Sequence, residues 1–373
     1  MITELCLVLG ITYFFTALYL MSQKSPEKTE QSNLPEISVL VAMRDEEKNI
    51  SSCLQSLAGQ NYPTHLFRVI IIDDRSADNS AAIAEEFVKS NENFQLIHIR
   101  EDLHGLYGKM NALSQALEQV DSEIVLITDA DCIVPKSWIR TYASYFNPNT
   151  GMTGGLTTLV PLEFMSIQED SVPLFAKIQA IDWLFLQSIA SGTSNAGKPV
   201  TILGNNFGFR MAAYHETGGF KKLGFSITED FALMKAIEKT GNWKIKHTQD
   251  IDNTVFSSPV KTLKDFYHQR QRWISGGKSS RPWGYFLMAQ SLLAHISIIL
   301  VFSFSQWNAG AGAGIGLILG IDYLLIKQQT RRLNIKYLNR YFIHFEIFYI
   351  LYTVIFGVLF FLPTKIIWKN RTY

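Results

Sequence analysis

The chain has 373 residues and a formal net charge of +1. This length allows a large domain with a sizeable core plus additional segments, and the near-neutral charge provides no overall field that would attract nucleic acid. Hydrophobic residues make up 47% of the chain, and they concentrate at both ends, whereas most charge lies between residues 23 and 281. The three cysteines, Cys6, Cys53 and Cys132, are odd in number and lack metal-ligand spacing. We therefore expect a reducing, cytosolic environment for the middle of the chain.

The N-terminal segment, residues 5–21, is an uninterrupted apolar run. It lacks a basic start and a small-residue cleavage site, so an uncleaved membrane anchor is favoured over a signal peptide. Lys24 and Lys28 follow it, which favours a cytosolic position for the next segment. Residues 23–35 are polar, contain two prolines and are typical of a linker.

Strand and helix patterns alternate after the linker. The expected strands are residues 37–41, 68–72, 95–99 and 123–127, and the expected helices are residues 46–57, 78–89 and 108–119. Such alternation with short connections predicts an α/β domain with a mostly parallel sheet that is covered by helices on both faces. The sequence contains neither a Gly-x-Gly-x-x-Gly nor a P-loop pattern, which argues against a dinucleotide fold and a P-loop nucleotidase.

Polar loops follow three of the expected strands at what should be one edge of the sheet: residues 44–46, 73–76 and 129–131. Ligands of open α/β sheets bind outside the carboxyl ends of the strands. Asp129 and Asp131, separated by one small residue, can hold a hard divalent cation that also takes phosphate oxygens; the alternative is a solvated turn. Asp73 or Asp74 can accept hydrogen bonds from a base or ribose.

Three further polar residues are candidates for ligand binding. Lys109 is the second residue of an expected helix, whose N-terminal amides together with the ammonium group can favour an anion. Asn205 and Asn206 stand between two glycines. They either bind a polar ligand or shape a turn.

Two helices in the second half of the chain carry aromatic and apolar stripes. The first, residues 173–191, is either a core helix or one that lies in a membrane interface. The second, residues 262–275, contains Arg270 and Arg272, which can neutralise phosphate, and Trp273, which can pack on a sugar face. The alternative for the second helix is a basic amphipathic helix resting on lipid headgroups. Thr262 and Asp265 form its expected capping pair.

Between these helices, Thr228-Glu229-Asp230 begins a helix that should run to Lys239. Thr228 is the expected N-cap, and the two acids complement the helix dipole. A helix N-terminus also keeps a carboxylate ionised, which suits a general base.

Taken in order, these motifs resemble a known signature. Its members in this chain are Asp73-Asp74, Asp129-Ala130-Asp131, Thr228-Glu229-Asp230 and Gln269-Arg270-Gln271-Arg272-Trp273. Their order is that of the D, D-x-D, D, Q-x-x-R-W signature of membrane-bound inverting family 2 glycosyltransferases, such as cellulose synthases and ceramide glucosyltransferases. Residues 108–113 are similar to the family's Gly-Lys-x-x-Ala-Leu segment. The resemblance covers roughly residues 36–280, and the chain departs from the pattern at residues 42–46 and at Arg75.

This resemblance implies a GT-A, Rossmann-like catalytic domain and a nucleotide-sugar donor. Asp73 or Asp74 would contact the base and ribose. Asp129 and Asp131 would hold the diphosphate together with Mg2+ or Mn2+, and Asp230 would deprotonate the acceptor hydroxyl.

The resemblance also implies roles for the remaining motif residues. Lys109, Gln269 and Arg270 join the expected donor-binding set. Glu229, Arg272 and Trp273 join Asp230 as expected catalytic residues, with the arginines and the tryptophan closing over diphosphate and acceptor.

The chain is membrane-like after residue 281. Residues 284–304, 309–326 and 341–362 are three expected spans, and the basic loop 327–340 should be cytosolic. With the N-terminal anchor this gives four spans, an external N-terminus and a cytosolic catalytic domain. The basic tail at Lys365 would then lie outside, unless the last segment re-enters the membrane or lies along its surface.

The expected domains are therefore an anchor at residues 1–22, a linker at 23–35, a catalytic domain at 36–282 and a transmembrane region at 283–373. The expected protein is a multi-pass enzyme of the cell membrane.

The predicted function is transfer of glucose or a related hexose, with inversion, from a nucleotide-diphosphate sugar, expected to be a UDP-sugar, to the hydroxyl of a membrane lipid. The alternatives are a processive polysaccharide synthase and a non-catalytic nucleotide-sugar-binding membrane protein. A transporter would need more intramembrane polar residues than Asp322, His344 and Glu346.

Overall fold

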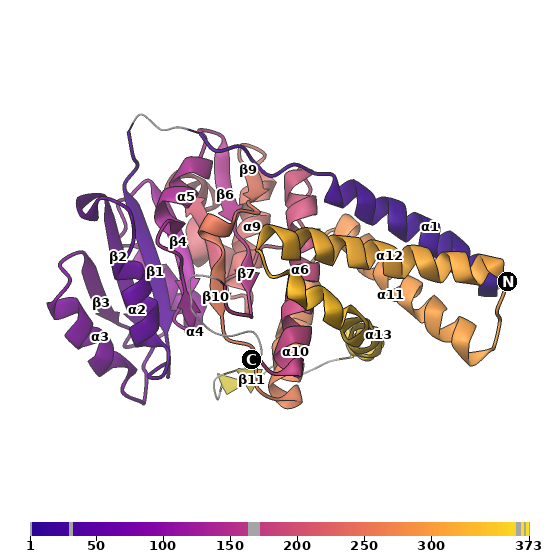
Figure 1. Cartoon of the computed structure of the whole chain (residues 1–373). Coiled ribbons are helices and arrows are strands. Elements are labelled where there is room, and N and C mark those ends of the chain that lie inside the picture. The colour runs from indigo at the N-terminus through magenta and orange to yellow at the C-terminus, as the bar shows by residue number, and fades with distance from the viewer. Residues whose placement is uncertain (1, 30–32, 163–171, 363–366, 369–370, 373) are drawn as a thin grey trace. The chain divides into compact units, whose positions relative to one another are not determined.

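The computed structural model describes residues 2–29, 33–162, 172–362, 367–368 and 371–372 (Figure 1). The chain divides into two compact units. The first, here called the sheet unit, consists of residues Ser25–Thr158 and Thr201–Ser258. The second, called the helical unit, consists of residues Met1–Lys24, Leu159–Val200 and Pro259–Tyr373.

The sheet unit is built from ten strands and several helices. In chain order its elements are β1 (Ile37–Met43), α2 (Ile50–Ala58), the 3-10 helix η1 (Thr64–Leu66), β2 (Phe67–Asp73), α3 (Ser80–Lys89), β3 (Phe94–His98), α4 (Gly108–Leu117), β4 (Ile124–Asp129), β5 (Cys132–Ile133), α5 (Trp138–Tyr145), β6 (Thr150–Gly154), β7 (Thr157–Thr158), β8 (Asn206–Arg210), α7 (Met211–Thr217), α8 (Gly219–Leu223), α9 (Glu229–Thr240), β9 (Lys244–His247), η4 (Ile251–Asn253) and β10 (Val255–Ser257).

The main sheet has the strand order β3-β2-β1-β4-β8-β6-β9, and a small second sheet has the order β5-β10-β7. Strands β3, β2, β1 and β4 are parallel, whereas β8 is antiparallel to both of its neighbours. The predicted α/β class with a mostly parallel sheet is confirmed.

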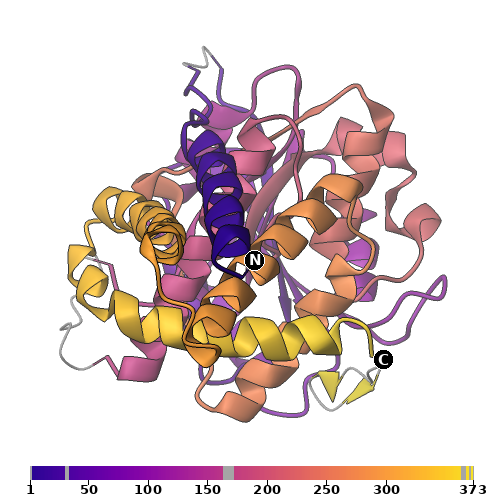
Figure 2. The same ribbon diagram turned by 90° about the vertical axis from the view of Figure 1, so that its right-hand side faces the viewer.

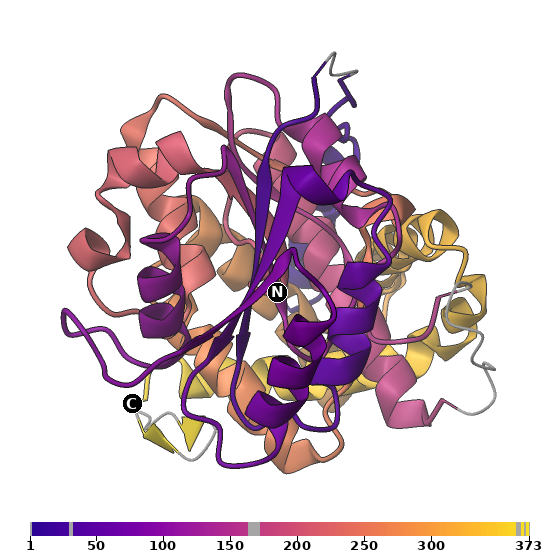
Figure 3. The same cartoon turned by 90° about the vertical axis from the view of Figure 1, so that its left-hand side faces the viewer.

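Both faces of the main sheet are buried, which explains the continuous apolar runs in its strands. Alternate residues of one strand point to opposite faces: Val39 and Val41 belong to a core with α2 and α5, while Leu40 belongs to a second core with α4 and α9. Figure 3 shows α2 and α3 on one side of the sheet and α4 on the other.

Helix α2 begins at Ile50, later than the sequence pattern predicts. The preceding residues are held instead by the neighbouring loop, because the amide of Glu46 donates to Oγ of Ser80 at 2.7 Å and that of Glu47 donates to Oδ2 of Asp78 at 3.0 Å. Long-range hydrogen bonds thus replace a first helical turn that local propensity favours.

The helical unit contains the remaining elements. They are α1 (Ile2–Met21), α6 (Leu174–Asn195), α10 (Leu263–Gly277), α11 (Pro282–Ser303), α12 (Ala309–Arg332), the 3-10 helix η5 (Lys336–Tyr341), α13 (Phe342–Leu359), β11 (Ile367–Trp368) and β12 (Arg371–Thr372). Within the described residues, four segments are long and apolar enough to cross a membrane, namely Ile2–Met21, Pro282–Ser303, Ala309–Arg332 and Lys336–Leu359.

One sequence expectation changes in this unit. Helix α12 continues to Arg332, so the expected loop from residue 327 was wrong at its start: the basic residues there extend the helix as its last turns, where cations complement the helix dipole. The basic tail residues Lys365 and Lys369 lie outside the described residues, so the side of the membrane on which the tail lies stays a prediction.

Close backbone approaches hold the apolar helices together. Helix α1 runs alongside α12 (Figure 1), and a Cβ atom on Gly10 would lie only 2.6 Å from the carbonyl oxygen of Gly314. Small residues at such a crossing allow helices to pack at short range in a membrane. Figure 2 shows the same unit with the N-terminus of α1 toward the viewer.

Helix α6 is buried along most of its length, including Lys177, Asp182 and Gln187. The helix thus packs against other helices of this unit, and its position relative to a membrane interface stays a prediction.

Candidate active site

The register of the main sheet brings the acidic loops to one edge. Strand β1 lies between β2 and β4, with Met43 beside Asp73 and Ala42 beside Asp129. Asp73 and Asp129 therefore both end their strands at the carboxyl edge of the sheet, where ligands of such sheets bind.

Lys109 is the centre of this edge. Its Nζ lies 2.6 Å from Oδ1 of Asp129, 2.9 Å from Oε1 of Glu229 and 3.0 Å from the carbonyl oxygen of Gly204. An ammonium group has three N–H donors, so these three oxygens engage all of them. Lys109 thus ties together β4, the N-terminus of α9 and the loop before β8.

The charge of Lys109 is fixed by its surroundings. Burial opposes a charged amine, but the carboxylates of Asp129 and Glu229 outweigh burial and raise the pKa of Lys109 above its ordinary value. The group is therefore a permanent cation, and it neutralises part of the acidic edge.

Asp129 and Asp131 differ in their contacts. The Asp129 side chain is 37% exposed and gives Oδ1 to Lys109, while Oδ2 of Asp131 accepts a hydrogen bond from Oγ of Ser257 on β10 at 3.3 Å. Beneath them, burial raises the pKa of the thiols of Cys53 and Cys132, so these cysteines are packing groups and not thiolate ligands.

The acids after β2 have separate partners. Oδ1 of Asp73 accepts from the amide of Ser76 at 3.1 Å. Oδ1 of Asp74 accepts from Nε and Nη2 of Arg75 at 3.1 and 3.0 Å, and Arg75 also bonds to Asp102 at 2.6 Å. Arg75 departs from the family pattern. Two of its nitrogens bond to the same carboxylate oxygen of Asp74 and so fix the position of this side chain.

Glu229 and Asp230 begin α9 but have different environments. Glu229 is buried and paired with Lys109. Asp230 is half-buried, and its Oδ1 accepts from the amide of Phe231 at 2.8 Å. Thr228 occupies the expected N-cap position, although its side chain makes no capping hydrogen bond.

Gly204 is a residue of this site that the sequence did not single out. Besides its carbonyl bond to Lys109, a Cβ atom at this position would lie 2.9 Å from Oδ2 of Asp230. The absence of a side chain therefore makes room for Asp230. The only signal in the sequence was a glycine before two asparagines.

The hydrogen bonds of Asn206 show whether this residue binds a ligand or shapes a turn. Its Nδ2 donates to the carbonyls of Leu156 and Asn253 at 2.6 and 2.9 Å, and its Oδ1 accepts from Trp138 and Tyr142 at 2.9 and 2.8 Å. All four hydrogen-bonding positions of the amide are used, so Asn206 shapes the loop and is not a ligand.

Gln269, Arg270, Arg272 and Trp273 belong to α10 in the helical unit. Arg270 is buried, its guanidinium pairs with Asp182, and its Cζ lies 4.0 Å from the ring centroid of Trp273. The predicted capping pair of this helix is confirmed, because Oγ1 of Thr262 accepts from the amide of Asp265 at 3.1 Å.

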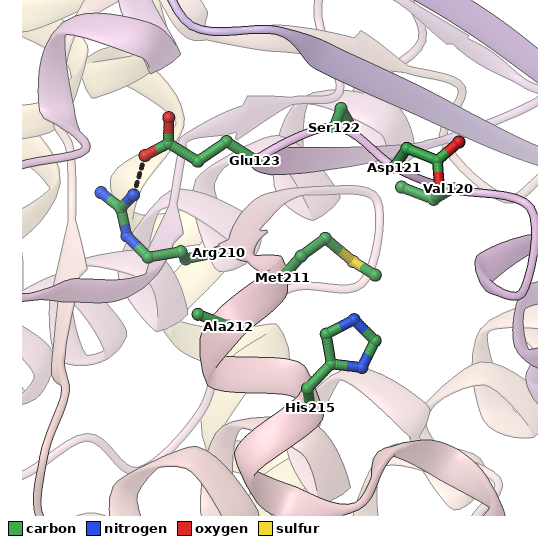
Figure 4. A pocket seen from close by; sticks show the side chains of 8 residues that line it. All are labelled: Val120, Asp121, Ser122, Glu123, Arg210, Met211, Ala212 and His215. Atoms are coloured by element: carbon green, nitrogen blue, oxygen red, sulfur yellow. Dashed lines mark hydrogen bonds and ion pairs between the residues drawn. The ribbon is translucent and has the colours of Figure 1, made fainter.

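A separate pocket lies at the opposite edge of the sheet (Figure 4). It is lined by residues 120–123, before β4, and by residues 210–215 around the start of α7. Its two charged side chains nearest the strands, Glu123 and Arg210, already pair with each other. The pocket lies at the amino end of β4, whereas Asp129 ends that strand at the carboxyl edge.

Comparison of structures defines the class of protein. A mannosyltransferase from Pyrobaculum calidifontis, solved in complex with GDP-Man and Mn2+, matches with a TM-score of 0.60 at 15% identity over 94% of this chain and 99% of that chain. The chain has the fold of GT-A glycosyltransferases, as expected. A family model for glycosyl transferase family 21 matches residues 2–373. The chain belongs to this family, which lies within the family 2 superfamily, so the resemblance found in the motifs is confirmed.

The similar relatives include a glycolipid synthase and a polysaccharide synthase. A beta-monoglucosyldiacylglycerol synthase of Synechocystis sp. is 28% identical over 247 residues, which is 65% of this chain and 48% of the relative. A poly-beta-1,6-N-acetyl-D-glucosamine synthase of Staphylococcus epidermidis is 28% identical over 279 residues, which is 72% of this chain and 61% of the relative. The chain thus spans about half to three fifths of the length of these relatives.

Proposed function

We propose that this protein is an inverting glycosyltransferase that moves a hexose, glucose or a close relative, from a nucleotide-diphosphate sugar to the hydroxyl of a membrane lipid. The observation that carries the proposal is the acidic edge of the sheet unit, in which Lys109 joins Asp129 to Glu229 beside the half-buried Asp230. Membership of glycosyl transferase family 21 supports the reaction class.

Asp230 is the proposed general base. It stands at the N-terminus of α9, whose dipole favours the ionised carboxylate. A carboxylate that takes the proton of an attacking hydroxyl needs a fixed position and at least partial access. The side chain of Asp230 is half-buried and accepts a hydrogen bond from the amide of Phe231, and Gly204 leaves the room that it occupies. A single displacement by that hydroxyl inverts the anomeric carbon.

Glu229 and Lys109 are proposed to position the site. Lys109 pairs with both Glu229 and Asp129, so it holds the start of α9 against the end of β4. Through this link Asp230 and the Asp129–Asp131 loop keep a fixed separation.

Asp129 and Asp131 are proposed to bind the diphosphate together with Mg2+ or Mn2+. The donor set fits such a hard cation, because both side chains offer carboxylate oxygen and the Asp129 side chain is accessible. When bound, the cation would supply positive charge to the leaving diphosphate. Asp73 and Asp74 are the proposed contacts to base and ribose, and the roles predicted for Gln269, Arg270, Arg272 and Trp273 remain proposals.

A lipid acceptor is supported by two observations. The part of the chain that the structure describes contains four helices that could cross a membrane, which would keep the enzyme where lipid hydroxyls are. One group of relatives is named for the synthesis of a glucosylated diacylglycerol.

The proposal is tested with the purified full-length chain in mixed lipid–detergent micelles. A panel of radiolabelled UDP- and GDP-hexoses is supplied with extracted membrane lipid, with Mn2+ or with excess chelator, and the lipid phase is counted. We expect label in lipid from one UDP-hexose, and none in chelator. Full transfer in excess chelator would contradict the metal role, and no transfer from any donor would contradict the reaction.

A further inference from the structure

The helical unit contains a buried polar cluster that the proposed reaction does not use. It is formed by His295 on α11, Asp322 on α12 and Glu346 on α13, all of which are buried. One side-chain donor atom from each residue lies within 4.8 Å of the others. Each helix is otherwise apolar enough to cross a membrane, and ionisable residues in such helices are costly unless they are paired or bind a cation.

The imidazole of His295 points one lone pair into the cluster. Its Nδ1 lies 2.7 Å from the carbonyl oxygen of Ser291. A carbonyl only accepts, so Nδ1 carries the hydrogen. In the neutral ring Nε2 is then an acceptor, and it faces Oδ2 of Asp322 at 3.1 Å. Two acceptors at this distance need a proton or a metal ion between them.

The carboxylates of Asp322 and Glu346 add negative charge to the cluster, and this charge has to be neutralised. Oδ1 of Asp322 accepts from the hydroxyl of Tyr13 at 2.7 Å, which leaves Oδ2 toward His295. Both oxygens of Glu346 are buried and accept no hydrogen bond from the described residues, and Oε2 lies 3.9 Å from Nε2 of His295. An ionised carboxylate without a donor in such a place is strongly unfavourable.

We propose that His295, Asp322 and Glu346 bind one divalent transition-metal ion of the zinc class. One imidazole nitrogen and two carboxylate oxygens are ligands that Zn2+ accepts, and two carboxylates balance its charge inside an apolar helix bundle. Zinc–ligand bonds of about 2.0–2.2 Å at tetrahedral angles place donor atoms roughly 3.3–3.6 Å apart. The two separations from Nε2 of His295, 3.1 Å to Asp322 and 3.9 Å to Glu346, bracket this range, and all three ligand atoms lie within 4.8 Å of one another.

The surroundings match those of a metal ligand set. A metal-binding histidine usually donates its other ring hydrogen to a carbonyl, and a metal-binding carboxylate is usually hydrogen-bonded by a neighbour. Ser291 and Tyr13 supply these two contacts. The ion would connect α11, α12 and α13. Helix α1 would support it through the hydrogen bond from Tyr13 to Asp322. This site is separate from the Asp129–Asp131 loop and does not depend on the proposed function.

The first test uses the wild-type chain. The full-length protein is purified in detergent through a tag without histidines, dialysed against metal-free buffer and analysed by plasma mass spectrometry. We expect close to one zinc-class ion per chain, as for a structural site. Protein stripped with a strong chelator should regain one ion from Zn2+, and from Co2+ it should gain visible absorption of a four- or five-coordinate ion. Wild-type protein that holds no such ion, both as purified and after refilling, would overturn the proposal.

Variants separate this ion from a donor-site cation. Asp131→Ala should retain the ion, whereas Glu346→Gln and His295→Gln should lose it. In the wild type, chelation should lower the thermal unfolding midpoint, because an ion that binds only the folded state stabilises it; in Glu346→Gln chelation should change nothing. Full metal content in Glu346→Gln, or loss of the ion in Asp131→Ala, would also overturn the proposal. The wild-type measurement stands even if a variant fails to fold.

Discussion

At the scale of single residues, the site depends on groups that do not all touch substrate. Lys109 gives its three hydrogens to Asp129, Glu229 and Gly204. The structure thus favours a positioning role for this residue, and the anion-binding role expected from its place at a helix start stays a prediction. Gly204 has no side chain, and this leaves room for the side chain of Asp230.

Replacement of Lys109 by methionine should strongly destabilise the protein. The change leaves the carboxylate of Glu229, whose side chain is only 9% exposed, without its cation, and breaking a buried ion pair costs about 3–5 kcal/mol. Denaturant unfolding measures the loss. Lys221→Met is the control, because its pair with Glu118 is exposed and should contribute at most about 1 kcal/mol. Equal effects of the two changes would show that Lys109 does not hold the edge together.

Asp230→Asn should preserve the fold and donor binding but reduce transfer by about 10²–10⁴-fold, the usual contribution of a general base. The amide keeps the shape of the carboxylate but cannot take a proton from the acceptor. Donor binding and single-turnover transfer are measured separately. A variant with a near-normal rate would show that Asp230 only caps α9.

Gly204→Ala should also reduce transfer, because it should displace the side chain of Asp230. The new methyl group would lie 2.9 Å from Oδ2 of Asp230, so the side chain of Asp230 must move while the fold is kept. We expect lower transfer with an unchanged unfolding midpoint. Gly59→Ala is the matched control, since its nearest neighbour would be at 3.5 Å, an ordinary contact. Unaltered transfer in Gly204→Ala would contradict the requirement for a fixed Asp230.

At the scale of elements, α10 is joined to its neighbours through Arg270. The guanidinium pairs with Asp182 on α6, and Asp182 also accepts a hydrogen bond from the hydroxyl of Tyr352 on α13. The ring centroids of Trp273 and Phe266 lie 4.0 and 4.6 Å from Cζ of Arg270. One buried ion pair thus connects three helices.

The single change Asp182→Leu should therefore destabilise the chain more than the double change Asp182→Leu with Arg270→Met. The single change leaves a buried guanidinium without its counter-ion, at a cost of about 3–5 kcal/mol, whereas replacement of both partners by apolar groups is often nearly neutral. Thermal unfolding in detergent compares the variants. A double variant less stable than the single one would show that the pair contributes no such coupling.

Strand β9 provides a pH-dependent element. Burial lowers the pKa of His247 from 6.5 to about 4. As the pH falls below 6.5 the unfolded chain takes up a proton that the folded chain refuses until about pH 4, so stability is lost across this window. The loss at pH 5 is at most about 2 kcal/mol. Denaturant midpoints at neutral pH and at pH 5 should differ more for the wild type than for His247→Gln, and equal differences would exclude this contribution.

At the scale of the whole molecule, the chain combines a GT-A fold with four helices that could span a membrane. Relatives with names of both lipid and polymer synthases match it, so the size of the product is the decisive property. A polymer that crosses a bilayer needs a polar path, because each unpaired hydroxyl in hydrocarbon costs several kcal/mol, on the order of 2–7. The polar side chains His295, Asp322 and Glu346 instead meet in a buried cluster.

We therefore predict a product with one or a few sugars on lipid. Purified protein is supplied with donor, with and without extracted lipid, and the product is sized by chromatography. Transfer should require lipid and yield only short products. A long, glycosidase-sensitive polymer formed without lipid would instead identify a polysaccharide synthase.

The sequence alone determined the features that depend on local pattern. Apolar runs with short connections predicted the parallel strands β1 to β4 and the helices between them, and long apolar segments predicted the four candidate spans. The acids at strand ends were placed on one edge, because parallel strands end together.

Only the tertiary structure decided which distant residues meet. Strands β6 to β10 are short or rich in glycine, so their pairing depends on neighbours and not on a period of their own. The partnership of Lys109 with Glu229 joins residues far apart in the chain. In the helical unit His344 is exposed, whereas His295 joins Asp322 and Glu346. Helical periodicity gives a residue's face on its own helix, but the rotation of one helix against another is set by packing of both surfaces.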